Sequence, residues 1–208
     1  MLLKFEDMIK AHGMKVKGIL HVGAHLAEEA AEYSRLGIHN VYWVEGNADN
    51  IPAIERAVYQ YDHWVICALI TDRDREAIQF NITNYDSMSS SVLEFGTHPT
   101  FSPDTVFVER RMVESRTLDS LGAEYEWFPG VNLLNMDLQG AELLALNGAK
   151  QLLRRIDYVY TEVNNKEVYK GCAQVEELDA FLSDFERVET GWVGDQGWGD
   201  ALFVRRGR

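Results

Sequence analysis

Long apolar runs and cysteine are both scarce in this chain of 208 residues. No stretch of about 20 apolar residues is present to cross a bilayer, and the mixed-charge start MLLKFEDMIKAHGMK lacks the apolar core of a signal peptide. The two cysteines, Cys67 and Cys172, give neither a disulfide framework nor metal-ligand spacing. These absences predict a cytoplasmic protein with no membrane partner.

Positive charge is also scarce, because 20 Lys and Arg face 33 Asp and Glu, for a formal net charge of −13. Proteins that wrap nucleic acids neutralise phosphates with Lys and Arg. Here the only basic cluster is Arg205, Arg206 and Arg208 at the C-terminus. The composition therefore predicts no nucleic-acid partner and favours a neutral substrate such as a sugar hydroxyl, on a small molecule or a glycan. The oligomeric state cannot be read from the sequence.

Linkers, repeats and low-complexity tracts are absent as well, so we expect one domain over residues 1–208. An amphipathic helix over residues 2–12, ended by Gly13, opens it. Apolar runs and helical spacing then alternate, which is typical of a parallel sheet with helices on its faces. Strands are predicted at 18–22, 41–44, 64–70, 131–136, 158–163, 185–192 and 201–205, and helices at 26–36, 48–60, 141–153 and 174–184.

The middle of the chain departs from this alternation. Two further strands are predicted at 77–82 and 105–117, and a polar segment at 83–104 separates them. A loop of this length inside a compact domain is usually functional, so we expect it to face the substrate. Four aromatic side chains are candidates to stack on the apolar face of a sugar, and the alternative for each is ordinary packing within the protein: Tyr85, Phe95, Phe101 and Trp198.

Polar residues follow several predicted strands, where ligands of open α/β sheets bind. Gly23 permits a tight turn after the first strand, and Glu45 ends the second strand with the spacing of a ribose-binding acid. His25 and Ala27 stand where a pyrophosphate-binding loop often has glycine. A nucleotide cofactor without a pyrophosphate therefore fits better than a dinucleotide.

A second polar cluster, Asn135-Met-Asp137-Leu-Gln-Gly140-Ala-Glu142, follows the strand at 131–136. Asp137 ends that strand, Glu162 lies at the end of the next, and neighbouring carboxylates of this kind can raise one pKa and supply a base. Glu142 falls in the first turn of a helix, where the helix dipole alone favours an acid. Asp137, Glu162 and a substrate diol are also able to hold a divalent metal, but no closed ligand set is present, and no residue is assigned to a metal.

The stretch from Leu133 to Ala149 (LLNMDLQGAELLALNGA) resembles the motif of the FkbM methyltransferase family. Further segments similar to that family are His21–His25, Val44–Asn47, Ser89–Ser91, Arg116–Leu121 and Trp198–Val204. The resemblance implies a Rossmann-like class I methyltransferase fold: a mostly parallel seven-stranded sheet with an antiparallel C-terminal strand and helices on both faces. It implies an S-adenosylmethionine-dependent O-methyltransferase that modifies a sugar hydroxyl of a glycan or glycosylated product.

The resemblance also implies roles for individual residues, although His21 stands where the family usually has Asp. Apart from the resemblance, a weakly nucleophilic hydroxyl needs a base to remove its proton, and here Asp137 is the first candidate, Glu162 the second and His98, in the 83–104 loop, the third. Cofactor-binding residues are expected to be His21, Gly23, Ala24, His25, Glu45, Asn47, Asp72 and Ser90. Substrate-binding residues are expected to be Ser91, Glu142 and Trp198.

Two other functions compete with this interpretation. A nicotinamide-dependent oxidoreductase shares the first turn and Glu45, but the later glycines are missing and no Tyr-x-x-x-Lys pair is present. A non-catalytic or decayed binding module is compatible with the changes at His21 and His25. Retention of Glu45, Asp137 and Glu142 argues against decay.

Overall fold

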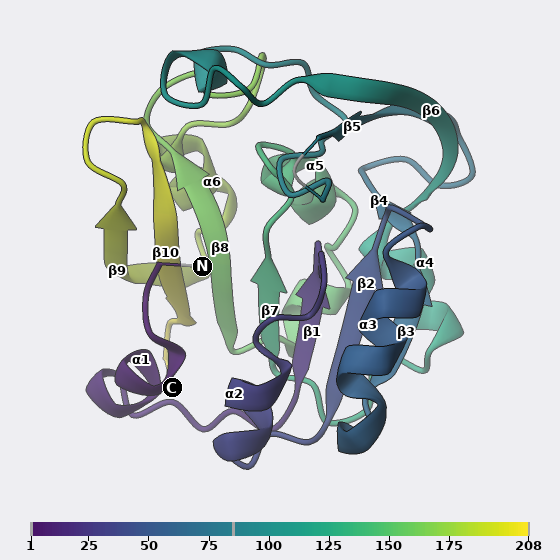
Figure 1. The fold of residues 1–208 in the computed structure, drawn as a ribbon. Helices are drawn as coiled ribbons and strands as arrows, with labels where there is room; N and C mark the ends of the chain where they lie inside the picture. The colour runs from purple at the N-terminus through teal and green to yellow at the C-terminus, as the bar shows by residue number, and fades with distance from the viewer. Residues whose placement is uncertain (1, 85, 208) are drawn as a thin grey trace.

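A seven-stranded sheet forms the centre of the computed structural model, which describes residues 2–84 and 86–207. Its strand order is β3-β2-β1-β7-β8-β10-β9 (Figure 1). The first five of these strands run parallel, and β10 lies antiparallel to both of its neighbours. This is the predicted class I methyltransferase sheet. The bounds are β1 (Ile19–Val22), β2 (Val41–Glu45), β3 (Trp64–Cys67), β7 (Leu133–Met136), β8 (Tyr158–Asn164), β9 (Phe185–Trp192) and β10 (Trp198–Arg205).

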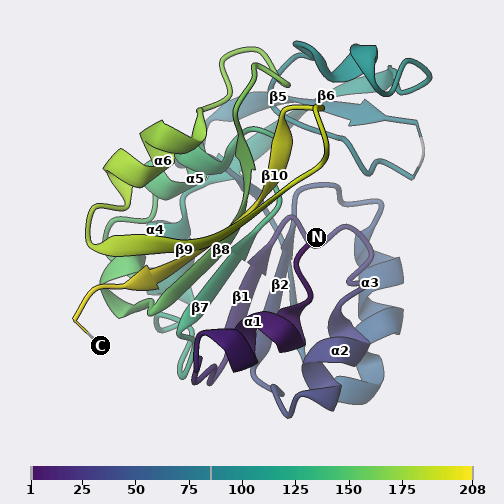
Figure 2. The ribbon, with the colours of Figure 1, turned by 90° about the vertical axis from the view of Figure 1, so that its left-hand side faces the viewer.

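Helices cover both faces of the sheet, as predicted (Figure 2). One face packs against α1 (Phe5–Ala11), α2 (Ala30–Arg35) and α3 (Ile51–Val58), and the other against α4 (Leu118–Glu124), α5 (Glu142–Asn147) and α6 (Val175–Phe181). All residues of β1, β2, β7 and β8 are buried, which explains their continuous apolar runs. Among the described residues there are also three short 3₁₀ turns, η1 (Tyr59–Tyr61), η2 (His98–Thr100) and η3 (Leu152–Arg155).

A second, three-stranded sheet lies beyond the carboxyl ends of the parallel strands (Figure 1). It consists of β4 (Leu69–Ile70), β6 (Phe107–Arg116) and β5 (Ala77–Thr83), in that order. The single strand predicted at 64–70 is therefore wrong. The chain leaves the main sheet at Ala68, because Leu69 packs with Phe80 and Ile82 in a separate apolar cluster instead.

Two other element predictions need correction, and one helix was missed. The helix predicted at 141–153 divides into α5 and η3 around Gly148, whose missing Cβ leaves room for the Thr71 carbonyl oxygen, 2.7 Å from where a Cβ would lie. β10 begins at Trp198, ahead of the strand predicted at 201–205, because its first residues pair with the end of β8. Helix α4 was not predicted.

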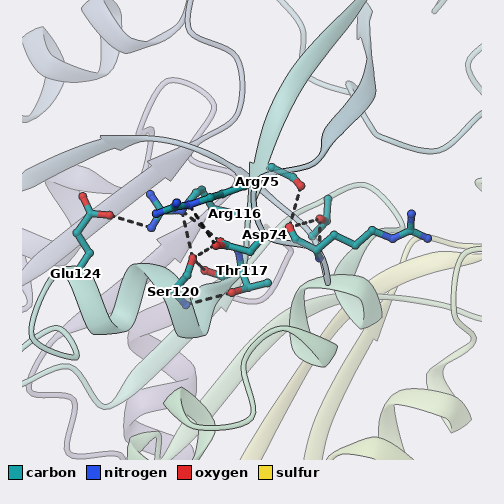
Figure 3. A network of polar contacts seen from close by, with 9 residues as sticks. Asp74, Arg75, Arg116, Thr117, Ser120 and Glu124 are labelled. Atoms are coloured by element: carbon teal, nitrogen blue, oxygen red, sulfur yellow. Dashed lines mark hydrogen bonds and ion pairs between the residues drawn. The ribbon is translucent and has the colours of Figure 1, made fainter.

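Helix α4 is fixed to β6 by a network of polar contacts (Figure 3). Thr117 caps the helix, since its hydroxyl oxygen accepts from the N–H of Ser120 at 3.1 Å. The Asp74 carboxylate accepts from the Ser120 hydroxyl, from the Thr117 N–H at 3.2 Å and from Arg116 at 3.3 Å. Arg116 also donates to Glu124 at 2.8 Å. The family-like segment Arg116–Leu121 therefore has an architectural role.

No helix within the described residues is long and apolar enough to cross a membrane. The cellular location stays a prediction.

Candidate active site

A cavity of about 390 Å³ opens where β1, β2 and β7 end. Its walls come from the turns after these three strands, from β8 and β10, and from the 83–104 loop. The predicted residues that line it are His21, Gly23, Ala24, His25, Glu45, Ser90, Ser91, His98, Asp137, Glu162 and Trp198. Asn47, Asp72 and Glu142 do not line it.

Gly23 brings the turn after β1 against the end of β7. Its φ is +83°, and a Cβ at this position would lie 1.9 Å from the carbonyl oxygen of Asp137. The Gly23 and Ala24 N–H groups donate to the Val44 carbonyl at 2.9 and 3.1 Å. Only glycine fits this conformation and this close approach, so the sequence's glycine fixes how two strand ends meet.

Glu45 is buried at the end of β2, with 7% of its surface exposed. One carboxylate oxygen accepts from the N–H of His25 at 2.9 Å, and the other from the N–H of Asn47 at 2.6 Å. Burial raises its pKa, while both hydrogen bonds oppose that shift. Asn47 therefore acts on Glu45 through its backbone.

The His25 ring connects the first turn to the 83–104 loop. Its Nδ1 lies 2.6 Å from a Glu28 carboxylate oxygen, and its Nε2 lies 2.9 Å from the Asp86 carbonyl oxygen. The hydrogen bond to Glu28 raises the pKa of His25 to about 9, against the opposing effect of partial burial. At neutral pH the ring is therefore a cation that donates from both nitrogens.

His21 is buried among aromatic side chains. Its ring stacks on Trp43 with centroids 4.7 Å apart, and its Nδ1 lies 3.2 Å from the Tyr33 hydroxyl and 3.3 Å from the Asn135 amide nitrogen. Burial lowers its pKa to about 3, so the imidazole is neutral. A neutral ring thus replaces the carboxylate usual in the resembling family.

Asp137 and Glu162 are joined by one side chain, Gln139. The Gln139 amide nitrogen donates to Asp137 at 2.5 Å and to Glu162 at 3.0 Å. Burial raises the pKa of Asp137 to about 6 and that of Glu162 well above its usual value, and the neighbouring carboxylates add to both shifts. The structure therefore brings the two predicted acids together, and one donor serves both.

Glu142 stabilises the loop that carries this pair. One of its carboxylate oxygens accepts from the N–H groups of Leu138 at 2.8 Å and Gly140 at 3.3 Å. Burial raises the pKa of Glu142 to about 7. Its oxygen is turned to the backbone of the loop and Glu142 does not line the cavity, which corrects its predicted role in substrate binding.

Asp72 lies away from the cavity as well. It is exposed, and a carboxylate oxygen lies 3.8 Å from the Arg73 guanidinium. The departure of the chain into β4 carries Asp72 off the main sheet, and Leu69 and Ile70 line the cavity in its place.

Aromatic side chains form the end of the cavity near the 83–104 loop. His98, Phe101, Tyr169 and Trp198 all line it. The buried His98 stacks on Phe95 with centroids 4.4 Å apart, and its Nδ1 has no hydrogen-bond partner in the described part of the chain. Burial lowers the pKa of His98, so the ring is neutral at pH 7. Tyr85 lies outside the described residues.

The serines of the 83–104 loop are engaged with the protein itself. The Ser90 hydroxyl oxygen accepts from the N–H of Thr83 at 3.0 Å, and the Ser91 hydroxyl donates to the Gln139 carbonyl at 2.8 Å. Their hydroxyls therefore shape the cavity wall.

The residues lining the cavity that sequence reasoning missed include Glu29, Gln139, Tyr169 and Asp200. Gln139 lies inside the Asp137–Glu142 motif, so its position was a usable signal. Asp200 pairs with Glu162 across β8 and β10, and it accepts from the Tyr160 hydroxyl at 2.8 Å and from the Leu2 N–H. Nothing in the local sequence indicates that long-range register.

Acidic side chains dominate the charge of the cavity. Six acids line it, namely Glu28, Glu29, Glu45, Asp137, Glu162 and Asp200, whereas no Lys or Arg does so within residues 2–84 and 86–207. The described residues also contain no group of three His, Cys, Asp or Glu able to hold a metal ion. This surface suits a neutral or cationic ligand better than a phosphate.

Two comparisons with known sequences bear on the function. The model of the "Methyltransferase FkbM domain" family matches residues 21–188. The 2-O-methyltransferase NoeI of Sinorhizobium fredii is 34% identical over 76 residues, which are 36% of this chain and 31% of that protein. The match thus spans about a third of the length of this relative.

Solved structures share the fold at low sequence identity. A candidate tRNA (m1A22) methyltransferase of Streptococcus pneumoniae, in complex with S-adenosyl-L-methionine, is 13% identical, with a TM-score of 0.55 over 99% of this chain and 73% of that one. A SAM-dependent methyltransferase of Aquifex aeolicus is 14% identical, with a TM-score of 0.51 over 96% and 88% of the two chains. These similarities establish the architecture.

Proposed function

The chain belongs to the FkbM methyltransferase family and is an S-adenosylmethionine-dependent methyltransferase, and from that premise we propose that it methylates a sugar hydroxyl of a glycan or glycosylated product. The observation that supports this most is the Asp137–Glu162 pair inside an acidic, partly aromatic cavity. Family membership sets aside the nicotinamide-dependent oxidoreductase, and the methyl-transfer assay below separates an active enzyme from a non-catalytic module.

The cavity has the features that the cofactor requires. Each Glu45 oxygen already accepts one backbone N–H and retains a lone pair for a ribose hydroxyl. Gly23, Ala24 and His25 line the cavity in the turn beside it, and Gly23 lets this turn lie against the end of β7. We propose that these residues and His21 hold the cofactor, with Ser90 shaping the wall. Once bound, the cofactor's sulfonium supplies an activated methyl group.

Asp137 is the proposed base. A sugar hydroxyl is a weak nucleophile, so a carboxylate that accepts its proton during transfer accelerates the reaction. With a pKa of about 6, Asp137 is ionised at neutral pH and still basic enough to take up a proton. Burial and the neighbouring carboxylates raise the pKa of Glu162 well above its usual value, and Glu162 is the second candidate for the base. The neutral His98, with a free Nδ1, is the third candidate.

The cavity surface supports a neutral acceptor over RNA. Its described lining offers a phosphate backbone no Lys or Arg, and the charge of His25 is already paired with Glu28. The aromatic rings of Phe101 and Trp198 offer flat apolar surfaces on which a sugar ring can lie, with few polar groups to fix its orientation. Ser91 and Trp198 remain the proposed residues on the acceptor side.

The test is methyl transfer from radiolabelled S-adenosylmethionine to a panel of neutral oligosaccharides, glycolipids and RNA. We expect label in a carbohydrate fraction, in an alkali-stable methyl ether located by linkage analysis, and none with Asp137→Asn. Label in RNA, or on a nitrogen atom, would contradict the proposal.

A further inference from the structure

Gln139 makes three side-chain hydrogen bonds inside the cavity, and together they fix which way its amide faces. Its amide oxygen accepts from the Tyr169 hydroxyl at 2.7 Å, and its amide nitrogen donates to Asp137 at 2.5 Å and Glu162 at 3.0 Å. An amide turned by 180° would set its oxygen against the two acids, whereas the Tyr169 hydroxyl could accept from the amide nitrogen and donate to the Ser89 carbonyl oxygen, 3.2 Å away. The acids therefore select the orientation in which both amide hydrogens face them, and Tyr169 supports it by donating to the amide oxygen.

The backbone of Gln139 is fixed as well. Its φ of +53° lies in the left-handed region, which is unfavourable for a residue with a side chain. Its carbonyl accepts from the Ser91 hydroxyl at 2.8 Å, and the Ser91 oxygen in turn accepts from the N–H of Leu93 at 3.0 Å. The next residue, Gly140, lacks the Cβ that would come within 3.0 Å of Tyr169. Side chain and backbone thus hold one conformation.

From these contacts we infer that Gln139, supported by Tyr169, is a positioning residue that holds Asp137 and Glu162 in one arrangement and couples them to Ser91 of the 83–104 loop. This inference rests on the proposed function for the catalytic meaning of the pair. It assigns Gln139 no direct contact with substrate.

A shared donor has a definite electrostatic effect on the pair. The Gln139 hydrogen bond lowers the pKa of Asp137, against the burial that raises it. Burial and the nearby carboxylates Glu162 and Asp137 raise the pKa of Tyr169 far above its usual value, so Tyr169 stays a neutral donor. Loss of either partner should therefore raise the pKa of Asp137 and weaken its orientation.

The direct test is a carboxyl ¹³C NMR titration of wild type, Gln139→Leu and Tyr169→Phe, with Asp137→Asn and Glu162→Gln used to assign the signals. Gln139→Leu should raise the pKa of Asp137 by about one unit, because a hydrogen bond to a charged group is lost. Tyr169→Phe keeps the aromatic ring and should also raise the pKa of Asp137, by a smaller amount. Tyr59→Phe, at an exposed tyrosine, is the control and should change nothing.

Once a methyl acceptor has been identified, the kcat of Gln139→Leu should be about 10- to 100-fold below that of the wild type, while the KM for the cofactor stays near the wild-type value. The pH at which kcat is half-maximal should rise with the pKa of Asp137. Folded variants whose Asp137 titrates as in wild type would overturn the inference, since Gln139 would then be only structural. Failure to methylate any sugar would instead overturn the proposed function, because the NMR titration needs no acceptor.

Discussion

Glu45→Gln tests the cofactor site most sharply, because the substitution preserves shape and removes one acceptor and the charge. In the wild type both carboxylate oxygens accept backbone N–H groups, from His25 at 2.9 Å and from Asn47 at 2.6 Å. A glutamine has one acceptor oxygen, so its NH₂ group must face one of these donors. With only 7% of Glu45 exposed, water cannot replace the lost bond.

Two separate losses follow from this geometry. The unpaired backbone N–H should lower the free energy of unfolding by about 1–3 kcal/mol without ligand. The ribose hydroxyls should lose a charged acceptor, which weakens S-adenosylhomocysteine binding by about 10- to 100-fold. Urea unfolding followed by tryptophan fluorescence measures the first, and isothermal titration calorimetry the second.

Glu28→Gln is the matched control, since Glu28 also lines the cavity and contacts His25 but does not end β2. It should bind S-adenosylhomocysteine with nearly wild-type affinity. If folded Glu45→Gln bound the ligand within about two-fold of the wild-type Kd, the assignment of Glu45 to the ribose would be refuted. Wild-type protein that binds no S-adenosylhomocysteine would refute the whole cofactor site.

Three further predictions address the base, the first turn and the charged histidine. Asp137→Asn should lower turnover by about 100- to 10,000-fold while the affinity for S-adenosylhomocysteine is preserved. The wild-type rate should rise with pH through about 6, where Asp137 loses its proton. If calorimetry showed an equal loss of S-adenosylhomocysteine affinity, Asp137 would be reassigned to cofactor binding. Gly23→Ala should destabilise the fold by at least about 2 kcal/mol in urea unfolding, because the new Cβ would meet a carbonyl oxygen at 1.9 Å. Gly13→Ala is the control and should destabilise the fold less, because Gly13 also has a positive φ, +58°, but no atom lies within 4 Å of its Cβ position. Equal losses of stability would contradict the close approach at Gly23. The folded pKa of His25 lies above the unfolded value of 6.5, so its contribution to stability is full below pH 6.5 and is lost as pH rises through about 9. For a partly exposed ring this contribution is about 1 kcal/mol, and a urea series in which Glu28→Gln shows the same loss would disprove it.

The parts of the site that the sequence predicted are those defined within a few residues of one strand. The apolar runs at β1 and β2 locate Gly23 and Glu45 at strand ends, and parallel strands bring such ends to one edge. The motif after β7 locates Asp137 in the same way. The positions of Gly23, Glu45 and Asp137 could be predicted from the alternation of strands and helices alone. All three line the same cavity in the structure.

Predictions failed or fell short where partners are distant in sequence. The Ser91–Gln139 and Tyr169–Gln139 hydrogen bonds join residues 48 and 30 positions apart, and no local pattern records them. Asp72 was predicted to bind the cofactor because the strand before it was expected to continue to residue 70 in one sheet. The chain instead leaves the main sheet at Ala68 and enters β4. Glu142 was expected near the substrate, yet its oxygen is used by the loop backbone.

The sequence by itself determined the class of fold and the family, because hydrophobic periodicity and a contiguous motif are both local properties of the chain. Only the tertiary structure decided which polar atoms face the cavity and which are consumed by the protein. Burial and hydrogen bonding set the charge of His21, His25 and Asp137, and both depend on neighbours that folding alone brings together.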